Sequence, residues 1–461
     1  MIFAGRKVLV LGLGDTGLSM AKWLARRGAS VRVADTRTEP PRLAELKRSL
    51  PAVPAYCGPL QHEMLAGVDF IAISPGVPLA EPNVQRAIAA GARVVGDIEL
   101  FAQAEADRRP QIIAVTGTNG KSTVTSLVGA MARAAGADCE VAGNIGPAVL
   151  DALMRREDTG QPAALWVLEL SSFQLETTTS LAADAAAVLN ITEDHLDRYL
   201  GIDDYARAKA RVFSGAGVQV LNRDDPRSLA MVLPGRKTIS FGLYAPQRAE
   251  DWGLLERGGE PWFAQGAKAL LAVREMKLAG LHNAANALAA LALCRALDLP
   301  LQPLLAALRE FKGLPHRVEL IGEANGVRWY DDSKGTNVGS TVAALTGLAQ
   351  RDTKVVLIAG GDGKGQDFSP LRNAVERSAR ELVLIGRDAP LIEAAVAGSG
   401  APIRRAASME QAVALAAHAA RPGDAVLLSP ACASFDMFRD YRHRGEVFRL
   451  AVEGVIDASK H

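Results

Sequence analysis

The fold is decided by a short stretch of the chain, Ile112-Ile-Ala-Val-Thr116-Gly117-Thr118-Asn119-Gly120-Lys121-Ser122-Thr123. Its apolar start predicts a strand over Ile112–Thr116, and the pattern that follows predicts a helix over Thr123–Ala135. Glycines between a strand and a helix let backbone N–H groups approach an anion, and the helix N-terminus adds a favourable dipole. Lys121 can then reach the β- and γ-phosphates of a nucleotide, and the Ser122 hydroxyl can ligate Mg²⁺. The stretch therefore predicts a nucleotide-phosphate site in an α/β fold.

The spacing of this loop departs from the standard G-x-x-x-x-G-K-[ST] pattern. Val115 stands five residues before Gly120, where that pattern has glycine, so the loop is a shorter G-x-x-G-K-S form. A glycine-rich turn with a chance lysine is the alternative interpretation. The strand before the loop and the helix after it favour the phosphate site.

Outward from this loop, short apolar runs alternate with longer helical patterns. The runs are near-continuous, which is typical of parallel strands covered by helices on both faces. The predicted strands are Lys7–Leu11, Ser30–Ala34, Asp69–Ser74, Ile112–Thr116, Leu165–Leu170, Ala186–Ile191, Lys354–Ala359, Glu381–Ile385 and Ala425–Ser429. The predicted helices include Leu18–Arg27, Thr123–Ala135, Ala284–Leu297 and Leu371–Ala379. This repeated strand–helix order indicates the α/β class.

Three domains are expected in a chain of 461 residues. We place them at residues 1–98, 99–314 and 315–461. The second begins with a helical stretch, Glu99–Ala106, ahead of the glycine-rich loop, and Leu314-Pro315-His316-Arg317 is typical of a hinge into the third.

Composition argues against several classes of protein. Lys plus Arg is 52 and Asp plus Glu is 51, and this near-neutral balance argues against a nucleic-acid or membrane-surface role. The four cysteines are scattered without a CxxC pair, which is typical of reduced thiols in a cytosolic protein. No apolar run approaches the roughly 18 residues of a membrane span, and the N-terminus lacks a signal-peptide pattern. We expect a cytoplasmic protein with no membrane span and no nucleic-acid partner.

Three polar side chains follow the central strands. Glu169 ends the predicted strand Leu165–Leu170, at the edge where α/β proteins bind ligands, although a helix-capping acid is the alternative. His195 follows the next strand, and Mg²⁺ prefers oxygen ligands, so a histidine alone would be an unusual choice. Lys209 by itself has the pattern of a solvated helix lysine.

A second glycine-rich loop, Gly12-Leu-Gly14-Asp-Thr-Gly17, follows the first predicted strand, and Asp35 lies about 20 residues further on. This is the dinucleotide-binding fingerprint, with a diphosphate at the helix start. Taken alone, the loop is compatible with NAD, because the sequence does not say which nucleoside is attached.

Taken together, the motifs resemble the Mur ligase family over essentially the whole chain and in order. The motifs are Gly117-Thr-Asn-Gly-Lys-Ser-Thr123, Gly143-Asn-Ile-Gly146, Glu169-Leu-Ser-Ser-Phe-Gln174, Asn190-Ile-Thr-Glu-Asp-His-Leu-Asp197, Gly280-Leu-His-Asn-Ala-Ala-Asn286, Leu314-Pro-His-Arg317, Asp332-Ser-Lys-Gly-Thr-Asn337, Gly361-Asp-Gly-Lys364 and Ser429-Pro-Ala-Cys-Ala-Ser434. The resemblance implies a Rossmann-like N-terminal domain that binds a UDP-linked substrate, a central P-loop ATPase-like domain with a mainly parallel sheet, and a Rossmann-like C-terminal domain that binds the amino acid.

The resemblance also implies a reaction. The member that the motifs match best adds D-glutamate to UDP-N-acetylmuramoyl-L-alanine through an acyl phosphate, in peptidoglycan precursor synthesis. The implied cofactors are ATP and two Mg²⁺ ions. Lys209 matches a lysine that is carbamylated in the family. We expect a monomer.

The site residues carry over position by position. The resemblance implies catalytic roles for Lys121, His195 and Lys209. It implies that Mg²⁺ is bound by Ser122, Glu169, His195 and Lys209. ATP would contact Gly117, Thr118, Asn119, Gly120, Lys121, Ser122, Thr123, Asn283, Asn286, Arg317 and Asp332. The UDP-linked substrate would contact Asp15, Thr16, Asp35, Thr36, Arg37, Ser74, Gly76, Asn144, Ser171 and Gln174. The glutamate would contact Lys334, Thr336, Lys364, Ser434 and Tyr441, the last standing where the family pattern has Phe. His316 matches a family histidine near the hinge.

Three rival hypotheses remain. A sister ligase could add L-glutamate or another amino acid with the same fold and ATP chemistry. An oxidoreductase using Gly12–Gly17 for NAD leaves the Gly117–Ser122 loop and the Glu169/His195 pair unexplained. A catalytically dead nucleotide-binding regulator would be expected to lack Lys121, Glu169 or His195, and all three are present.

Overall fold

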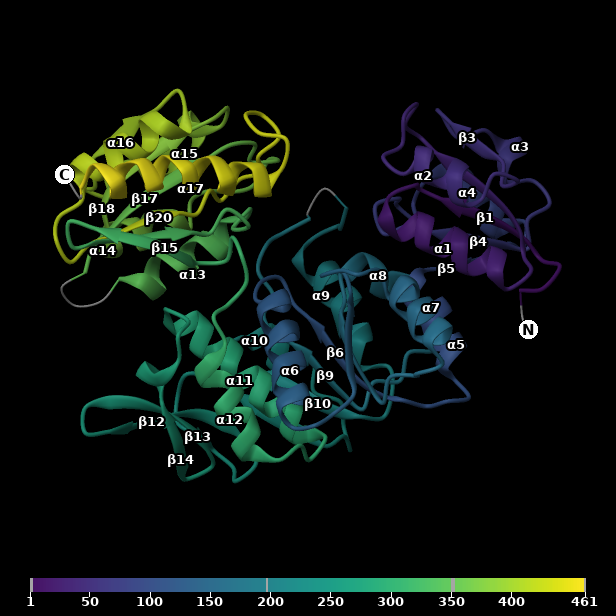
Figure 1. Ribbon diagram of the computed structural model, residues 1–461, viewed down its shortest axis with the longest axis horizontal. Coiled ribbons are helices and arrows are strands. Elements are labelled where there is room, and N and C mark those ends of the chain that lie inside the picture. The colour runs from purple at the N-terminus through teal and green to yellow at the C-terminus, as the bar shows by residue number, and fades with distance from the viewer. Residues whose placement is uncertain (1–2, 196–197, 350–352, 460–461) are drawn as a thin grey trace.

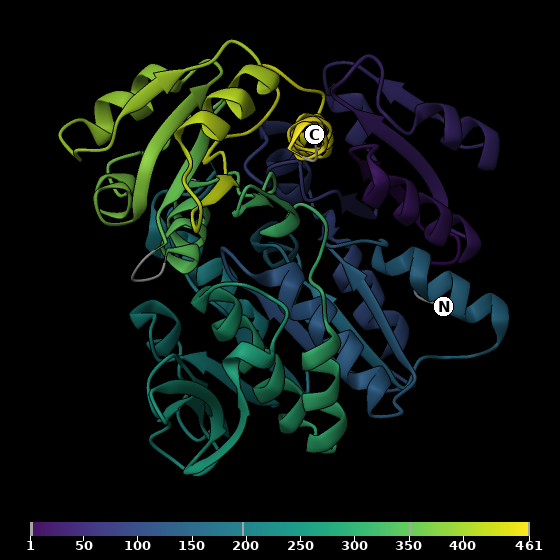
Figure 2. The same cartoon turned by 60° about the vertical axis from the view of Figure 1, so that its left-hand side comes forward.

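The apolar runs of the chain form three separate sheets, seen in the computed structural model as three units (Figure 1). The structure describes residues 3–195, 198–349 and 353–459. The first and third units lie on the same side of the middle unit in both views (Figures 1 and 2). Three α/β units with mainly parallel sheets confirm the predicted fold class. The sheets lie within the three predicted ranges, and the domain boundaries themselves stay a prediction.

The first sheet is parallel throughout, in the order β3-β2-β1-β4-β5. Its strands are β1 (Lys7–Leu11), β2 (Ser30–Asp35), β3 (Ala55–Cys57), β4 (Phe70–Ile73) and β5 (Arg93–Val95), with helices α1 (Asp15–Arg26), α2 (Leu43–Ser49), α3 (His62–Leu65) and α4 (Pro82–Ala89).

The middle sheet has the order β14-β13-β12-β11-β10-β9-β6-β8-β7. Its strands are β6 (Gln111–Thr116), β7 (Cys139–Gly143), β8 (Leu165–Glu169), β9 (Ala185–Val188), β10 (Val218–Asn222), β11 (Thr238–Phe241), β12 (Trp252–Arg257), β13 (Glu260–Gln265) and β14 (Lys268–Ala272). Its helices are α5 (Asp97–Glu105), α6 (Lys121–Ala134), α7 (Val149–Thr159), α8 (Ser172–Glu176), α9 (Ile202–Ala210), α10 (Pro226–Leu229), α11 (Leu281–Ala296) and α12 (Leu301–Glu310), with the 3-10 turns η1 (Arg211–Phe213) and η2 (Val273–Glu275).

The third sheet has the order β15-β16-β20-β17-β18-β19 and is parallel except for the β15–β16 pair. Its strands are β15 (Glu319–Ala324), β16 (Val327–Asp331), β17 (Val355–Gly360), β18 (Ala379–Ile385), β19 (Ile403–Arg405) and β20 (Ala425–Leu428), with helices α13 (Val338–Leu348), α14 (Leu371–Ser378), α15 (Ala389–Val396), α16 (Met409–Ala419) and α17 (Tyr441–Ala458).

The predicted strand Ala186–Ile191 is too long, because β9 ends at Val188. Beyond Val188 the backbone leaves the ladder, and the Asn190 carbonyl accepts a hydrogen bond from the Thr118 backbone N–H (2.9 Å). A run that serves as a strand up to Val188 therefore becomes a support for the glycine-rich loop.

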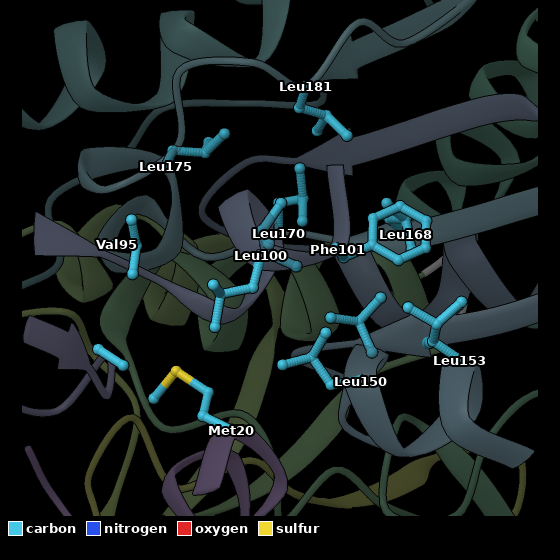
Figure 3. Packing of buried hydrophobic residues seen from close by; sticks show 14 of the residues in the cluster. Met20, Val95, Leu100, Phe101, Leu150, Leu153, Leu168, Leu170, Leu175 and Leu181 are labelled. Atoms are coloured by element: carbon cyan, nitrogen blue, oxygen red, sulfur yellow. The ribbon is translucent and has the colours of Figure 1, made fainter. Parts of the chain in front are cut away.

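One hydrophobic core joins the first and middle units. Met20 and Trp23 of α1 belong to the same buried cluster as Leu150 and Leu153 of α7 and Phe101 of α5. Figure 3 shows Met20 facing this cluster from the first unit. Burial of apolar side chains from both units fixes their relative placement, since exposing them would cost about 25 cal/mol per Å².

Among the residues that the structure describes, none of the helices combines the length and the apolar character that crossing a membrane demands.

Candidate active site

The glycine-rich loop has the predicted strand–loop–helix form, with β6 ending at Thr116 and α6 starting at Lys121. Gly120 has φ +84°, a backbone conformation that favours glycine, and a Cβ there would lie 2.4 Å from the Asn286 Oδ1 atom. The Lys121 Nζ atom donates to the carbonyls of Gly117 (2.9 Å) and Thr118 (2.7 Å). Burial lowers the pKa of Lys121, and the carboxylates of Glu169 and Asp194 oppose that effect.

Asn190, which the sequence reasoning did not single out, holds this loop in place. Its Oδ1 atom accepts from the Asn119 backbone N–H (2.8 Å), and its Nδ2 atom donates to the Asn119 carbonyl (3.1 Å). The sequence marks Asn190 only by its position as the first residue of the Asn190–Asp197 motif. Leu196 and Asp197 of that motif lie outside the described residues.

Glu169 lies at the carboxyl end of β8, as predicted, and is buried. Its Oε1 atom accepts from Asn144 Nδ2 (2.6 Å), whereas its Oε2 atom is buried with no hydrogen-bond partner among the described residues. Leaving a buried carboxylate oxygen unpaired is costly. The oxygen therefore fits a divalent cation, and Mg²⁺ prefers oxygen ligands.

Lys209 is not the solvated helix lysine that its spacing alone suggested, because it is 1% exposed. Its Nζ atom donates to Thr116 Oγ1 (3.4 Å) and lies 4.6 Å from the centre of the Tyr205 ring. Burial, and then the charge of Lys121, hold the pKa of Lys209 well below its usual range. The neutral amine is the form that reacts with CO₂ to give a carbamate, so the site fits the modification.

His195 follows β9 in the left-handed backbone region, with φ +55°. Its ring packs against the Phe173 ring, with centroids 4.7 Å apart, and its Nε2 atom lies 3.8 Å from Asp194 Oδ2. The side chain is 42% exposed. His195 therefore lies at the accessible edge of the site.

The third unit reaches the same loop. The Arg317 Nη2 atom donates to Ser122 Oγ (2.7 Å), and Asn337 Nδ2 donates to Asn119 Oδ1 (3.1 Å). Asp332 is buried and accepts from Ser429 Oγ (2.7 Å). Burial raises the pKa of Asp332 to about 7. Residues far apart in sequence thus meet at the nucleotide loop.

The two predicted asparagines of α11 also lie near the loop. Asn286 is the residue beside Gly120, and its Nδ2 atom donates to Asn283 Oδ1 (3.2 Å). Asn283 in turn donates to the Ala279 carbonyl (2.8 Å).

The candidate glutamate pocket is formed by loops after β16, β17 and β20. The Lys334 Nζ atom lies 3.9 Å from the centre of the Tyr441 ring, so these two predicted residues are brought together. Burial and the charge of Arg317 lower the pKa of Lys334 to about 8. Thr336 donates its backbone N–H to the Lys334 carbonyl (2.9 Å). Lys364 lies on an exposed turn whose Asp362 pairs through the backbone with Ala433, the neighbour of Ser434.

Arg444, another residue that the sequence reasoning missed, joins two of these loops. It is fully buried and donates to the Ser333 carbonyl (2.8 Å), to Cys432 (3.1 Å) and to Ala433 (3.2 Å). No spacing or motif marks it, because its burial arises only where α17 crosses the loops.

The predicted UDP-site residues of the first unit line one cavity of about 430 Å³. They are Asp15, Thr16, Asp35, Thr36, Arg37, Ser74 and Gly76, and Asn144 of the middle unit lines the cavity with them. Asp35 accepts from the Leu13 backbone (2.6 Å) and from the Arg37 guanidinium. Burial opposes the charged form of Asp35, but hydrogen bonds from Arg37 and Leu13 prevail and lower its pKa to about 2. Asn144 also donates to Glu169, so one side chain adjoins both the cavity and the candidate metal-binding carboxylate.

Ser171 and Gln174 have structural partners. They form a capping box at the start of α8, and Gln174 Nε2 donates to the buried Asp97 (2.9 Å). Their side chains therefore fix the loop after Glu169.

Three family models match the chain in order. They are the Mur ligase MurD-like N-terminal domain at residues 6–96, the Mur ligase middle domain at 115–294, and the Mur ligase glutamate ligase domain at 316–432.

Two curated relatives show similarity over nearly the full length. The UDP-N-acetylmuramoylalanine–D-glutamate ligase of Nitrosospira multiformis is 59% identical over 460 residues, covering 99% of this chain and 97% of that protein. The protein of the same name from Thiobacillus denitrificans is 58% identical, covering 98% and 96%.

Solved structures share the fold at low identity. The UDP-N-acetylmuramate–alanine ligase MurC of Thermotoga maritima matches with a TM-score of 0.61 and 18% identity, covering 97% of this chain and 99% of that one. MurF of Acinetobacter baumannii matches with a TM-score of 0.60 and 18% identity, covering 98% and 91%.

Proposed function

Since this chain belongs to the Mur ligase family, whose members form amide bonds at the expense of ATP, we propose that it adds D-glutamate to UDP-N-acetylmuramoyl-L-alanine. The reaction supplies a peptidoglycan precursor. The relatives that bear the name of this activity are aligned with nearly the whole chain. One structural observation carries the proposal: Asn144 contacts Glu169 and lines the UDP-site cavity, so a carboxylate attached to the UDP-linked substrate can meet the phosphate loop.

The reaction needs an activated acyl group. A carboxylate is a poor acyl donor until one of its oxygens becomes part of a phosphate leaving group. Transfer of the γ-phosphoryl group from ATP to the alanine carboxylate gives an acyl phosphate and ADP. The amine of glutamate then attacks the acyl carbon, and the tetrahedral intermediate collapses to the amide and phosphate.

Positive groups of this chain would bring the two anions together. Lys121 would release the Gly117 and Thr118 carbonyls and bind the transferred phosphoryl group. The other ATP contacts would come from the loop itself (Gly117 to Thr123) and from Asn283, Asn286, Arg317 and Asp332.

Two Mg²⁺ ions would be bound by Ser122, Glu169, His195 and a carbamylated Lys209. Bound there, Mg²⁺ would offset the charge of the phosphates. The unpaired Oε2 atom of Glu169 supports this assignment. For Lys209, the buried amine would lose a proton and bond to the carbon of CO₂, which gives a negatively charged ligand in place of an ammonium.

Lys334, Thr336, Lys364, Ser434 and Tyr441 would form the glutamate pocket, with the lysines meeting its side-chain carboxylate. The UDP-linked substrate would be bound by Asp15, Thr16, Asp35, Thr36, Arg37, Ser74, Gly76 and Asn144. Ser171 and Gln174 would contribute from the loop beyond Glu169. We further propose domains at 1–98, 99–314 and 315–461, a monomer, and a cytoplasmic location.

The test measures phosphate release from ATP with UDP-N-acetylmuramoyl-L-alanine and one amino acid at a time. We expect release with D-glutamate and little with L-glutamate. Release with L-glutamate alone, or with another amino acid alone, would keep the ligase class and replace the named substrate. Absence of any amino-acid-dependent release would refute the ligase reaction.

A further inference from the structure

Arg198 joins the loop that carries His195 to the first unit. Its Nη1 atom donates to the Pro75 carbonyl (2.7 Å), and its backbone N–H donates to the His195 carbonyl (2.9 Å). Pro75, Gly76 and Val77 are part of the wall of the UDP-site cavity. One residue therefore contacts both a wall of this cavity and the backbone of His195.

The Arg198 guanidinium is held in place from the other side. It forms an ion pair with Glu176 (2.7 Å), in which the side chains are 11% and 17% exposed. Its Cζ atom also lies 4.0 Å from the centre of the Phe173 ring, and that ring packs against the His195 ring. The Tyr199 hydroxyl donates to the second oxygen of Glu176. An ion pair or a hydrogen bond that involves a charged group is stronger when its side chains are little exposed than when they lie at the open surface.

Within the first unit, the cavity turn is held through Ser74. The Ser74 hydroxyl donates to the Gly12 carbonyl (2.9 Å), and the Val77 N–H donates to the Ser74 carbonyl (3.0 Å). Ser74 thus fixes the turn within the first unit, and Arg198 fixes it to the middle unit. Because Asn144 of the middle unit completes the cavity, the shape of the cavity depends on that second anchor.

Overall docking of the two units does not depend on Arg198. The shared apolar core between α1 and α7 and the ion pair of Arg27 with Glu157 hold them at a different place. A variant of Arg198 should therefore fold, with the loss confined to the cavity wall, because the backbone bond to His195 does not involve the side chain.

We propose that Arg198 is a positioning residue that sets the affinity for the UDP-linked substrate by fixing the Ser74–Val77 turn against the middle unit. The inference rests on the proposed function for the identity of that substrate. Arg198 touches neither substrate nor metal in this role. It acts on the cavity through the Pro75 carbonyl, while Glu176 and the Phe173 ring hold its guanidinium in place.

The test compares Arg198→Met and Arg198→Lys with the unaltered chain. Loss of a hydrogen bond from a charged donor should raise the Kd for UDP-N-acetylmuramoyl-L-alanine about tenfold in Arg198→Met, measured by calorimetry without ATP. The KM for this substrate should rise in parallel, while the KM values for ATP and D-glutamate stay within about twofold. Arg198→Lys should recover part of the affinity, since an ammonium can donate to Pro75 or pair with Glu176 but lacks the planar fork that does both.

Arg27→Met is the matched control. It also removes an arginine that crosses between the two units, but Arg27 pairs with Glu157 and lines no part of the cavity. We expect its Kd for the UDP-linked substrate to be unchanged.

Three results would overturn the inference: an unchanged Kd in Arg198→Met, an equal rise of all three KM values, or the same loss in Arg27→Met. Failure of the proposed function has a different signature, because the unaltered chain would then release no phosphate with any amino acid. The binding measurement needs no turnover, so the two failures are distinguishable.

Discussion

At the scale of the single residue, burial changes what a side chain can do. Lys209 has the sequence pattern of an exposed helix lysine, and Tyr205 and Lys121 lie beside it in the folded chain. The low pKa that results from burial favours a neutral amine. This is the physical ground on which we expect a carbamate rather than an ammonium at this position.

Lys209→Ala should lower kcat on the order of 100-fold, because a group that supports the metal site is lost. Added acetate or formate should restore part of the activity, since a small carboxylate can enter the space that the side chain leaves. Steady-state phosphate release with and without these anions measures the effect. Arg207→Ala, on the exposed face of the same helix, is the control for removing a cation, and should need no rescue. Lack of any rescue in Lys209→Ala would count against the carbamate.

His316 makes stability depend on pH. Its Nδ1 atom lies 2.7 Å from Oδ2 of the fully buried Asp331, and this hydrogen bond raises the pKa of His316 above its usual 6.5. A histidine whose pKa is raised by folding binds its proton more tightly in the folded state. Its contribution to stability is therefore complete below pH 6.5 and is lost as pH rises through the higher, folded-state pKa.

His316→Gln should consequently destabilise the chain most below pH 6.5, with a difference that shrinks at alkaline pH. Urea-unfolding midpoints across this pH range test the sign. His418→Gln, exposed on α16, controls for loss of a histidine. A difference that grows with pH would contradict the assignment.

At the scale of the element, the strand–loop–helix units follow from local pattern. The first loop needs glycine at position 17, because a Cβ there would lie 1.8 Å from the Gly12 carbonyl oxygen. Most predicted strands and helices appear with ends shifted by a few residues. The strands β12 to β14 and β15 were not predicted, because buried and exposed residues are mixed along them and they lack the continuous apolar runs of the central strands.

Gly17→Ala should destabilise the first unit by about 1–3 kcal/mol or more, because the added methyl group overlaps backbone that cannot move away cheaply. It should also weaken binding of the UDP-linked substrate. Thermal unfolding gives the stability change. Gly14→Ala is the matched substitution in the same loop, where a Cβ meets no atom within 4 Å, and it should unfold close to the unaltered chain. Equal stability of the two variants would refute the packing argument.

At the scale of the whole molecule, the site is divided among three units. ATP-contact candidates lie in the middle unit (Lys121, Asn286) and in the third (Arg317, Asp332), which are joined through the segment around Leu314–His316. Catalysis should therefore involve closure of the third unit on the middle one. Arg317 already bonds to Ser122 and Asn337 to Asn119 in this structure, and we expect a closed state to keep these bonds.

Small-angle scattering should show a smaller radius of gyration once a non-hydrolysable ATP analogue and the UDP-linked substrate are both present. Asn337→Ala should weaken this response, since it removes the contacts to Asn119 and Asp194. A radius that is the same with and without both ligands would contradict closure.

From the sequence alone, strand and helix periodicity predicted the α/β class and the glycine-rich loop predicted a phosphate site, because both are local properties of the chain. The candidate site residues came from the resemblance to the Mur ligase family, and the positions of Asp35 and Ser74 at the ends of strands supported the predicted lining of the cavity.

The folded structure was needed to show the contacts of Asn190, Arg198 and Arg444 and the burial of Lys209. It also showed the buried Glu169 oxygen that has no hydrogen-bond partner among the described residues. Desolvation and hydrogen bonding depend on which distant segments meet, and a pKa or an anchor between two units has no local signature. The glycine-rich loop could therefore be predicted from its own residues, whereas the contacts that hold it in place could be seen only in the folded molecule.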